Sequence, residues 1–206
     1  MRAVIISGGH ITNYEFVKSQ ISSSDTVICA DSGYNHAVLL DLSVSAIVGD
    51  FDSIGDVRIP KDVKIIRVPA KKDLTDTELA LHYARENDFR DFLFIAATGT
   101  RIDHSLANIL LLKSCVGRAE GAVIVDEHNK IMMTDSVITL CEPLSSTVSL
   151  IPIEDCHGVS TQGLEYQLQG ATLTVGMGLG ISNVMISKSA AISIEKGLLL
   201  VVVAKD

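Results

Sequence analysis

The sequence has few cysteines, and none of them forms a paired motif. Its four cysteines lie far apart and show no CxxC spacing, which argues against a zinc site or a disulfide framework. The six histidines likewise show no common metal-binding spacing, so each is interpreted as structural or exposed. A reducing cytoplasm is therefore the expected compartment.

Basic residues are also too few for a protein that coats nucleic acid or an anionic membrane. Seventeen Lys and Arg against 25 Asp and Glu give a formal net charge of -8. No uninterrupted apolar run is long enough to span a bilayer, and the N-terminus leads directly into a strand-like segment. We expect a soluble, unprocessed protein, which would need metal cations to offset repulsion if it acted on a polyphosphate.

Hydrophobic residues make up 47% of the 206-residue chain, and their pattern changes near residue 126. Before that point, short apolar runs alternate with helix-like stretches, as in a parallel sheet covered by helices. The runs are continuous, as buried parallel strands require. Strands are expected near residues 3–6, 26–30, 46–49, 64–68, 92–96 and 122–125.

Two helices can be located in this first part. Thr75 and Glu78 have capping-box spacing, which predicts a helix that begins at Thr75. Its expected apolar face is Leu79, Ala80, Tyr83 and Ala84. A second helix is expected after Asp103, with Leu106, Ile109 and Leu110 facing inward.

The second part is predicted to be all-β, because short β-branched segments alternate there with Gly, Ser, Asn and Asp. The glycine-dense stretch 176–180 follows no βα pattern and is interpreted as a tight turn. There is no internal repeat and no low-complexity linker. We therefore expect an α/β domain over residues 1–126 followed by a smaller all-β domain over 127–206.

Polar residues follow the expected strands of the first part, at the sheet edge where ligands bind in open parallel sheets. They lie in the loops 31–33, 49–53, 71–76 and 98–103. Five carboxylates would meet there and would repel one another unless hard cations such as magnesium lie between them. These are Asp50, Asp52, Asp73, Asp76 and Asp103.

The same edge offers groups that suit phosphate. Lys72 and Arg101 are cationic donors, and the helices that start near Thr75 and Asp103 add positive potential at their N-termini. Taken alone, each loop could instead be a cap or a turn: Asp31 could end its strand, and Thr75 could act only as an N-cap. Ser7-Gly8-Gly9 could be a simple turn or could let the backbone approach a nucleotide.

The motifs together resemble the bacterial thiamine pyrophosphokinase family along essentially the whole chain. The similar segments are ADSGYNHA, VGDFDSI, KKDLTDTELAL, GTRIDHSLANI, GLGISN and ISIEKGLLLVV. The resemblance implies an N-terminal Rossmann-like α/β domain that binds ATP and Mg²⁺ and a C-terminal β-sandwich that binds thiamine. It further implies a homodimer with thiamine between the subunits.

Residue roles carry over by matching motif. The resemblance implies metal binding by Asp50, Asp52 and Asp76, and transfer of diphosphate near Arg101 and Asp103. ATP would be bound by Asp31, Lys72, Asp73, Thr75 and Asp76, and thiamine by Ser182 and Asn183. The chain has no Trp, although some family members stack an indole on thiamine, so a different residue must cover that ring.

The implied reaction is attack of the thiamine hydroxyl on the β-phosphorus of ATP, with Asp103 as a candidate proton acceptor. One alternative is a metal-dependent phosphatase with Asp50 as nucleophile and Asp52 as acid. It leaves the segments around Asp76, Arg101 and Asn183 unexplained. A second alternative is a non-catalytic sensor that binds a nucleotide or thiamine and signals through dimerisation.

Overall fold

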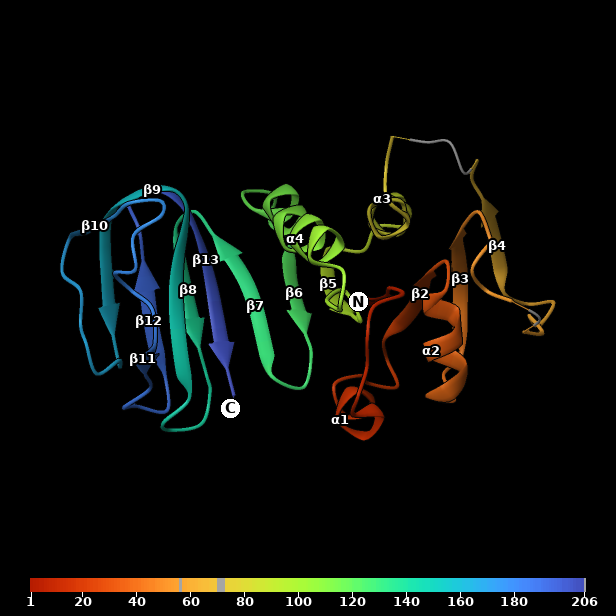
Figure 1. Ribbon diagram of the computed structural model, residues 1–206, viewed down its shortest axis with the longest axis horizontal. Coiled ribbons are helices and arrows are strands. Elements are labelled where there is room, and N and C mark those ends of the chain that lie inside the picture. The colour runs from red at the N-terminus through yellow and green to blue at the C-terminus, as the bar shows by residue number, and fades with distance from the viewer. Residues whose placement is uncertain (56, 70–72, 206) are drawn as a thin grey trace. The chain divides into compact units, whose positions relative to one another are not determined.

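The computed structural model describes residues 1–55, 57–69 and 73–205, which divide into two compact units (Figure 1). The units are Met1–Glu127 and His128–Asp206. Among the described residues, helices occur only in the first unit. None of these helices combines the length and the apolar character that crossing a membrane requires.

The first unit is built on a six-stranded sheet in which every neighbouring pair is parallel. Its strand order is β4-β3-β2-β1-β5-β6. The strands are β1 Arg2–Ile6, β2 Thr26–Ala30, β3 Val44–Gly49, β4 Lys64–Arg67, β5 Asp91–Ile95 and β6 Gly121–Val125. All six strands expected from the apolar runs are present; β1, β2, β3 and β5 are largely buried on both faces, whereas β4 is a mostly exposed edge strand.

The order of strands reverses direction at β1. The chain first adds β2, β3 and β4 on one side of β1 and then places β5 and β6 on the other side. The connection after β1 therefore leads to one side of β1, and the connection after β5 leads to the other side. Such a switch point is where open α/β sheets bind ligands.

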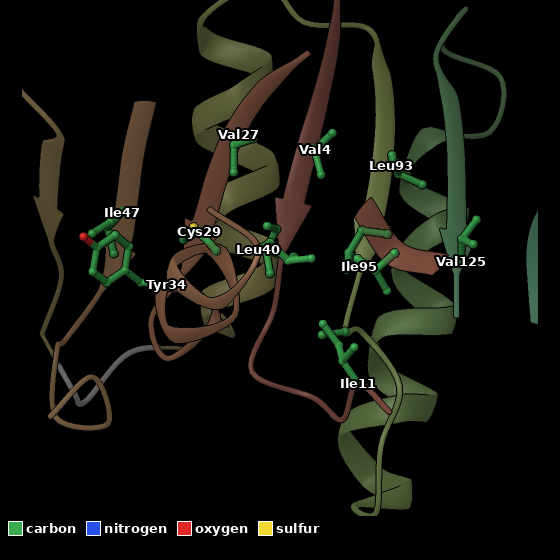
Figure 2. Packing of buried hydrophobic residues seen from close by; sticks show 14 of the residues in the cluster. Val4, Ile11, Val27, Cys29, Tyr34, Leu40, Ile47, Leu93, Ile95 and Val125 are labelled. Atoms are coloured by element: carbon green, nitrogen blue, oxygen red, sulfur yellow. The ribbon is translucent and has the colours of Figure 1, made fainter. Parts of the chain in front are cut away.

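Helices connect these strands, and alternate strand residues pack against them. The helices are α1 Tyr14–Ser19, α2 Gly33–Leu39, α3 Asp76–Glu86 and α4 Ile102–Leu111, followed by the 3₁₀ turn η1 Leu112–Cys115. Figure 2 shows Val4, Val27 and Leu93 of the sheet in one buried cluster with Tyr34 and Leu40. The intervening strand residues, among them Ile5 and Phe92, are fully buried on the opposite face.

Helix α3 begins as predicted, since Thr75 is its N-cap and Thr75 Oγ1 accepts a hydrogen bond of 3.2 Å from Glu78 N. The predicted apolar face is only partly right. Leu79 and Tyr83 are half-buried. The buried residues of α3 are Thr77, Ala80, Leu81 and Ala84. The helix is therefore rotated by part of a turn from the predicted orientation, and it buries Thr77 and Leu81 instead of Leu79 and Tyr83.

The predicted orientation of α4 is wrong. Leu106 and Leu110 are 53% and 48% exposed, and Ile109 is half-buried. The reason is that the polar side of the helix is tied to the preceding loop. Asn108 Nδ2 donates to the Ala97 carbonyl at 2.7 Å, and Ser105 Oγ donates to the Arg101 carbonyl at 3.0 Å. These bonds turn the leucines outward.

The second unit contains only antiparallel pairs, in the order β7-β13-β9-β12-β8 with β10 and β11 also paired to β9. Its strands are β7 Asn129–Thr134, β8 Val137–Leu140, β9 Thr147–Gln162, β10 Ala171–Leu173, β11 Asn183–Val184, β12 Ala190–Ser193 and β13 Lys196–Ala204. Strand β9 is much longer than its apolar run and pairs first with β13 and then with β12. The glycine-dense stretch 176–180 lies between β10 and β11 and contains turns, as predicted.

Candidate functional site

Three non-glycine residues at the carboxyl edge of the parallel sheet adopt left-handed backbone conformations. They are Asp31 (φ 45°) directly after β2, Phe51 (φ 70°) just after β3 and Ala96 (φ 51°) directly after β5. Residues other than glycine rarely adopt positive φ, and such strain gathers at ligand sites. These conformations set the direction of the three loops, but they do not single out this edge, because Asp41, Asp88 and Ala119 before β3, β5 and β6 also have positive φ.

The loops after β1 and β5 are packed backbone to backbone. Gly9 N donates to the Ala96 carbonyl at 2.8 Å, and His10 N donates to the Thr98 carbonyl at 3.1 Å. A Cβ atom at Gly9 would overlap the carbonyl oxygens of Ala96 and Thr98, so glycine is required there. His36 Nε2 donates to the Gly9 carbonyl at 2.8 Å and fixes the other side of the turn.

A cleft of about 550 Å³ opens above these loops at the switch point. The loops after β1, β2 and β5, the start of α3 and the first turns of α4 line it. Its charged lining residues are Asp31, Asp76 and Arg101, and His10 and His104 also line it. The first-turn amides of α3 supply positive potential, because helix N-termini attract anions. A polyphosphate fits a cleft with this lining.

Three carboxylates form a group beside the cleft. Oxygen atoms of Asp31, Asp50 and Asp52 all lie within 4.8 Å of one another. Asp31 Oδ1 accepts from Phe51 N at 3.1 Å, and Asp52 N donates to Asp50 Oδ1 at 3.2 Å. Among the described residues, no other set of three acidic, histidine or cysteine side chains comes as close together.

Asp31 is the most constrained member of this group. It is only 7% exposed, and burial raises the pKa of its carboxyl, with repulsion from Asp76 and Asp50 adding to the effect. Ionised carboxylates held this close call for a hard cation, and carboxylate oxygen is the ligand that Mg²⁺ prefers. The sequence assigned Asp31 to ATP, whereas the geometry places its carboxylate with the predicted metal ligands Asp50 and Asp52.

Two of the remaining residues of the predicted phosphate loop line the cleft. Asp76 lines the cleft and contributes to the electrostatic field at Asp31. Thr75 also lines the cleft, and Asp73 is exposed. Lys72 lies outside the described residues.

Arg101 and Asp103 form a two-bond ion pair at the start of α4. Arg101 Nε donates to Asp103 Oδ1 at 3.2 Å, and its terminal nitrogen donates to Oδ2 at 2.5 Å. The hydrogen bonds from Arg101 lower the pKa of Asp103 to about 2. Both side chains are mostly exposed, at 69% and 64%, so the pair can open without a large desolvation cost.

Ser182 and Asn183 lie in the second unit and differ sharply in burial. Ser182 is exposed and has a left-handed backbone (φ 57°). Asn183 is 4% exposed; its Oδ1 accepts from Tyr166 N at 3.0 Å, and its Nδ2 donates to the Tyr166 carbonyl at 2.6 Å. The Asn183 carboxamide therefore holds the backbone of an exposed tyrosine.

Sequence reasoning missed several polar residues that line the cleft. They are Thr77, Ser105 and Asn108. Thr98 Oγ1 donates to Asp126 Oδ2 at 2.9 Å, which ties the loop after β5 to the end of β6. The segment 98–108 contains several Thr, Ser and Asn residues, whose side chains often hydrogen-bond to loop backbone, and this composition could have indicated them.

Two family models match the chain, one in each unit. Residues 17–125 match the model described as "Thiamin pyrophosphokinase, catalytic domain". Residues 135–199 match the model described as "Thiamin pyrophosphokinase, vitamin B1 binding domain". The first match contains the three grouped carboxylates and the Arg101–Asp103 pair, and the second contains Asn183.

Individual relatives agree with these matches. The chain is 34% identical over 177 residues to the thiamine pyrophosphokinase of Bacillus subtilis (strain 168), covering 82% of this chain and 83% of the relative. The crystal structure of thiamine pyrophosphokinase from Bacillus subtilis superposes with a TM-score of 0.88 and 26% identity over all of both chains. The structure from Geobacillus thermodenitrificans gives a TM-score of 0.86 and 26% identity, covering 100% of this chain and 98% of that one.

Proposed function

Because this chain belongs to the thiamin pyrophosphokinase family, we propose that it transfers a diphosphate group from ATP to the hydroxyl of thiamine. The products are thiamine diphosphate and AMP. The observation that carries the proposal is the cleft at the β1/β5 switch point, which combines the N-terminus of α3, Arg101 and an adjacent group of three carboxylates. Phosphoryl transfer depends mainly on positioning and charge neutralisation, and these groups supply both.

We propose that Asp31, Asp50 and Asp52, together with Asp76, bind Mg²⁺. The donor set fits the ion, because it consists of hard carboxylate oxygens whose mutual repulsion a cation would relieve. When bound, Mg²⁺ would neutralise charge on the phosphate oxygens of ATP. The backbone amides of Phe51 and Ser32 both donate to the Asp31 carboxylate and hold it in place.

We propose that the triphosphate lies along the N-terminus of α3. Thr75 and Asp76 line the cleft there, and we include Lys72 and Asp73, which precede them in the sequence. Arg101 reaches the same cleft from the start of α4 and can donate two hydrogen bonds to phosphate oxygens. These groups would orient the β-phosphorus toward the thiamine hydroxyl.

The Arg101–Asp103 pair gives a route for the hydroxyl proton. While Arg101 is bound to Asp103, the pKa of the carboxyl is about 2, and it is a weak base. When phosphate oxygens compete for the guanidinium, the carboxylate loses its partner and its basicity rises. We propose that Asp103 then accepts the proton from the thiamine hydroxyl while Arg101 stabilises the phosphate charge.

We propose that the second unit is a β-sandwich that binds thiamine and that the active form is a cytoplasmic homodimer. Ser182 is exposed and can contact thiamine directly, whereas the carboxamide of Asn183 is bonded to the backbone of Tyr166. Asn183 would then act by holding Tyr166, whose side chain is 67% exposed. The chain has no Trp, and Tyr166 is an aromatic ring available to cover thiamine.

The test is to mix the protein with ATP, Mg²⁺ and thiamine and to separate the products by chromatography. The proposal predicts equal amounts of AMP and thiamine diphosphate. Release of orthophosphate with a trapped phospho-aspartate at Asp50 would instead identify a phosphatase. Binding of ATP or thiamine without any turnover would identify a sensor.

A further inference from the structure

Two buried hydroxyl groups meet at the floor of the cleft. Ser7 Oγ and Thr77 Oγ1 lie 2.8 Å apart, although the residues are 70 positions apart in the sequence. Ser7 follows β1 directly and is 3% exposed, and Thr77 lies in the first turn of α3 and is 7% exposed. Both residues line the cleft at the switch point. The pair therefore joins the end of the central strand to the N-terminus of α3.

One of the two hydroxyl hydrogens of this pair has no acceptor among the described residues. Two hydroxyls carry two hydrogens, and their mutual bond uses one of them. Within residues 1–55, 57–69 and 73–205, neither hydroxyl oxygen has a second hydrogen-bond partner; Ser7 N separately donates to the Ile95 carbonyl. Buried polar hydrogens normally find an acceptor. The second hydrogen is thus left for a group that enters the cleft.

The surroundings indicate which group this is. The pair adjoins the first turn of α3, where the positive end of the helix dipole favours an anion, and Arg101 lines the same cleft. Thr75 Oγ1 is already used as the N-cap acceptor for Glu78 N. The available hydroxyl hydrogen therefore faces a region of positive potential, and its natural acceptor is an anionic oxygen.

We propose that the Ser7–Thr77 pair donates a hydrogen bond to a phosphate oxygen of the nucleotide. In this arrangement Ser7 donates to Thr77, and Thr77, which lies on α3, donates to the phosphate. The inference rests on the proposed function for the identity of the nucleotide as ATP. It adds one ATP-binding residue, Thr77, and one residue that positions the Thr77 hydroxyl, Ser7; neither carries a charge.

The test is calorimetric titration of the purified full chain with Mg²⁺-ATP and, separately, with adenosine, in the absence of thiamine. Thr77→Val keeps the shape of the side chain but removes the hydroxyl, and it should weaken ATP binding about tenfold, the effect of one hydrogen bond to a charged group. Adenosine binding should not change. Ser7→Ala should cause a smaller loss, because the Thr77 hydroxyl remains.

Two further variants control for folding. Thr77→Ser restores the hydroxyl and should return ATP affinity to within about twofold of the unaltered chain. Thr134→Val removes another buried hydroxyl, 7% exposed and in the second unit, and should leave ATP binding unchanged. If thermal unfolding shows that Thr77→Val does not fold, the proposal is tested by the loss of ATP affinity in Ser7→Ala.

The results distinguish failure of the hydroxyl-pair proposal from failure of the proposed function. Normal ATP affinity in folded Thr77→Val and Ser7→Ala would overturn the hydroxyl-pair proposal and leave the proposed function intact. Equal weakening of ATP and adenosine would also overturn it, because the pair would then contact the nucleoside. If the unaltered chain does not bind ATP at all, the proposed function itself is contradicted.

Discussion

Asp31 Oδ1 accepts a hydrogen bond of 3.1 Å from the backbone amide of Phe51, and both residues have left-handed backbones. This bond joins the loop after β2 to the loop after β3. It brings the Asp31 carboxylate to Asp50 and Asp52, which flank Phe51 in the sequence. The three-carboxylate group therefore depends on two strained loops held together by one hydrogen bond.

The first prediction concerns Asp31. Asp31→Asn keeps an acceptor for Phe51 N but removes the charge, so turnover should fall at least about 100-fold at saturating Mg²⁺. Without Mg²⁺, the variant should unfold at a higher temperature than the unaltered chain, because it lacks a buried carboxylate repelled by Asp50 and Asp76. Steady-state kinetics and thermal unfolding measure the two effects.

The exposed carboxylate Asp62 provides the matched control for this prediction. Asp62→Asn should leave turnover and thermal unfolding unchanged. A normal rate in Asp31→Asn would remove Asp31 from the metal site, whereas loss of rate in both variants would point to a general charge effect.

The second prediction concerns the pKa of Asp103, which Arg101 lowers to about 2. A folded-state pKa below the ordinary value means that the pair favours the folded protein above about pH 4 and that this effect is lost as the pH falls toward 2. Arg101→Gln should raise the pKa of Asp103 toward its ordinary value. Carboxyl ¹³C NMR titration of both proteins measures the shift.

The same variant tests the catalytic role of Arg101. Arg101→Gln should lower kcat about 100-fold, because it removes a charged donor to the transferred phosphate. Arg101→Lys keeps the charge but loses the two-bond geometry, so its kcat should lie between those of the unaltered chain and Arg101→Gln.

The NMR titration has its own contradicting outcome. An unchanged pKa of Asp103 in Arg101→Gln would show that the ion pair is not present in solution.

The third prediction separates the roles of Ser182 and Asn183. Asn183→Ala leaves the Tyr166 amide and carbonyl without partners, so it should cost about 1 to 2 kcal/mol of unfolding free energy and raise the KM for thiamine more than that for ATP. Ser182→Gly suits the left-handed backbone and should raise only the KM for thiamine. Equal changes in both Michaelis constants would count against a thiamine site in the second unit.

The fourth prediction is that each active site is shared by two chains. Asp50→Asn alters the first unit and Asn183→Ala the second, and each variant alone should be nearly inactive at a thiamine concentration far below the raised KM of Asn183→Ala. After subunit exchange, mixed dimers would contain one intact site, and activity should reappear. Continued inactivity after demonstrated exchange, or full activity in a dilute monomer, would rule out a shared site.

The central strands of the first unit could be predicted because parallel strands that are buried on both faces appear as continuous apolar runs. The start of α3 could be predicted because Thr75 and Glu78 form a local capping interaction. Both signals depend only on near neighbours in the sequence. The positions of Asp50 and Asp52 followed from the same strand ends.

Features set by contacts between distant residues could not be predicted. The outward orientation of Leu106 and Leu110 depends on the bonds from Ser105 and Asn108 to the preceding loop, which the apolar pattern does not reveal. The place of Asp31 in the carboxylate group depends on its bond to Phe51, twenty residues away. The Ser7–Thr77 pair likewise appears only when β1 and α3 are packed together.

The central claim is that an intact diphosphate group passes from ATP to thiamine, and positional labelling of ATP tests it most directly. The protein would be incubated with Mg²⁺, thiamine and ATP labelled with ³²P at either the β or the γ position. The account predicts that both labels appear in thiamine diphosphate and that AMP is unlabelled. Label released as orthophosphate, or thiamine that acquires only the γ label, would contradict it.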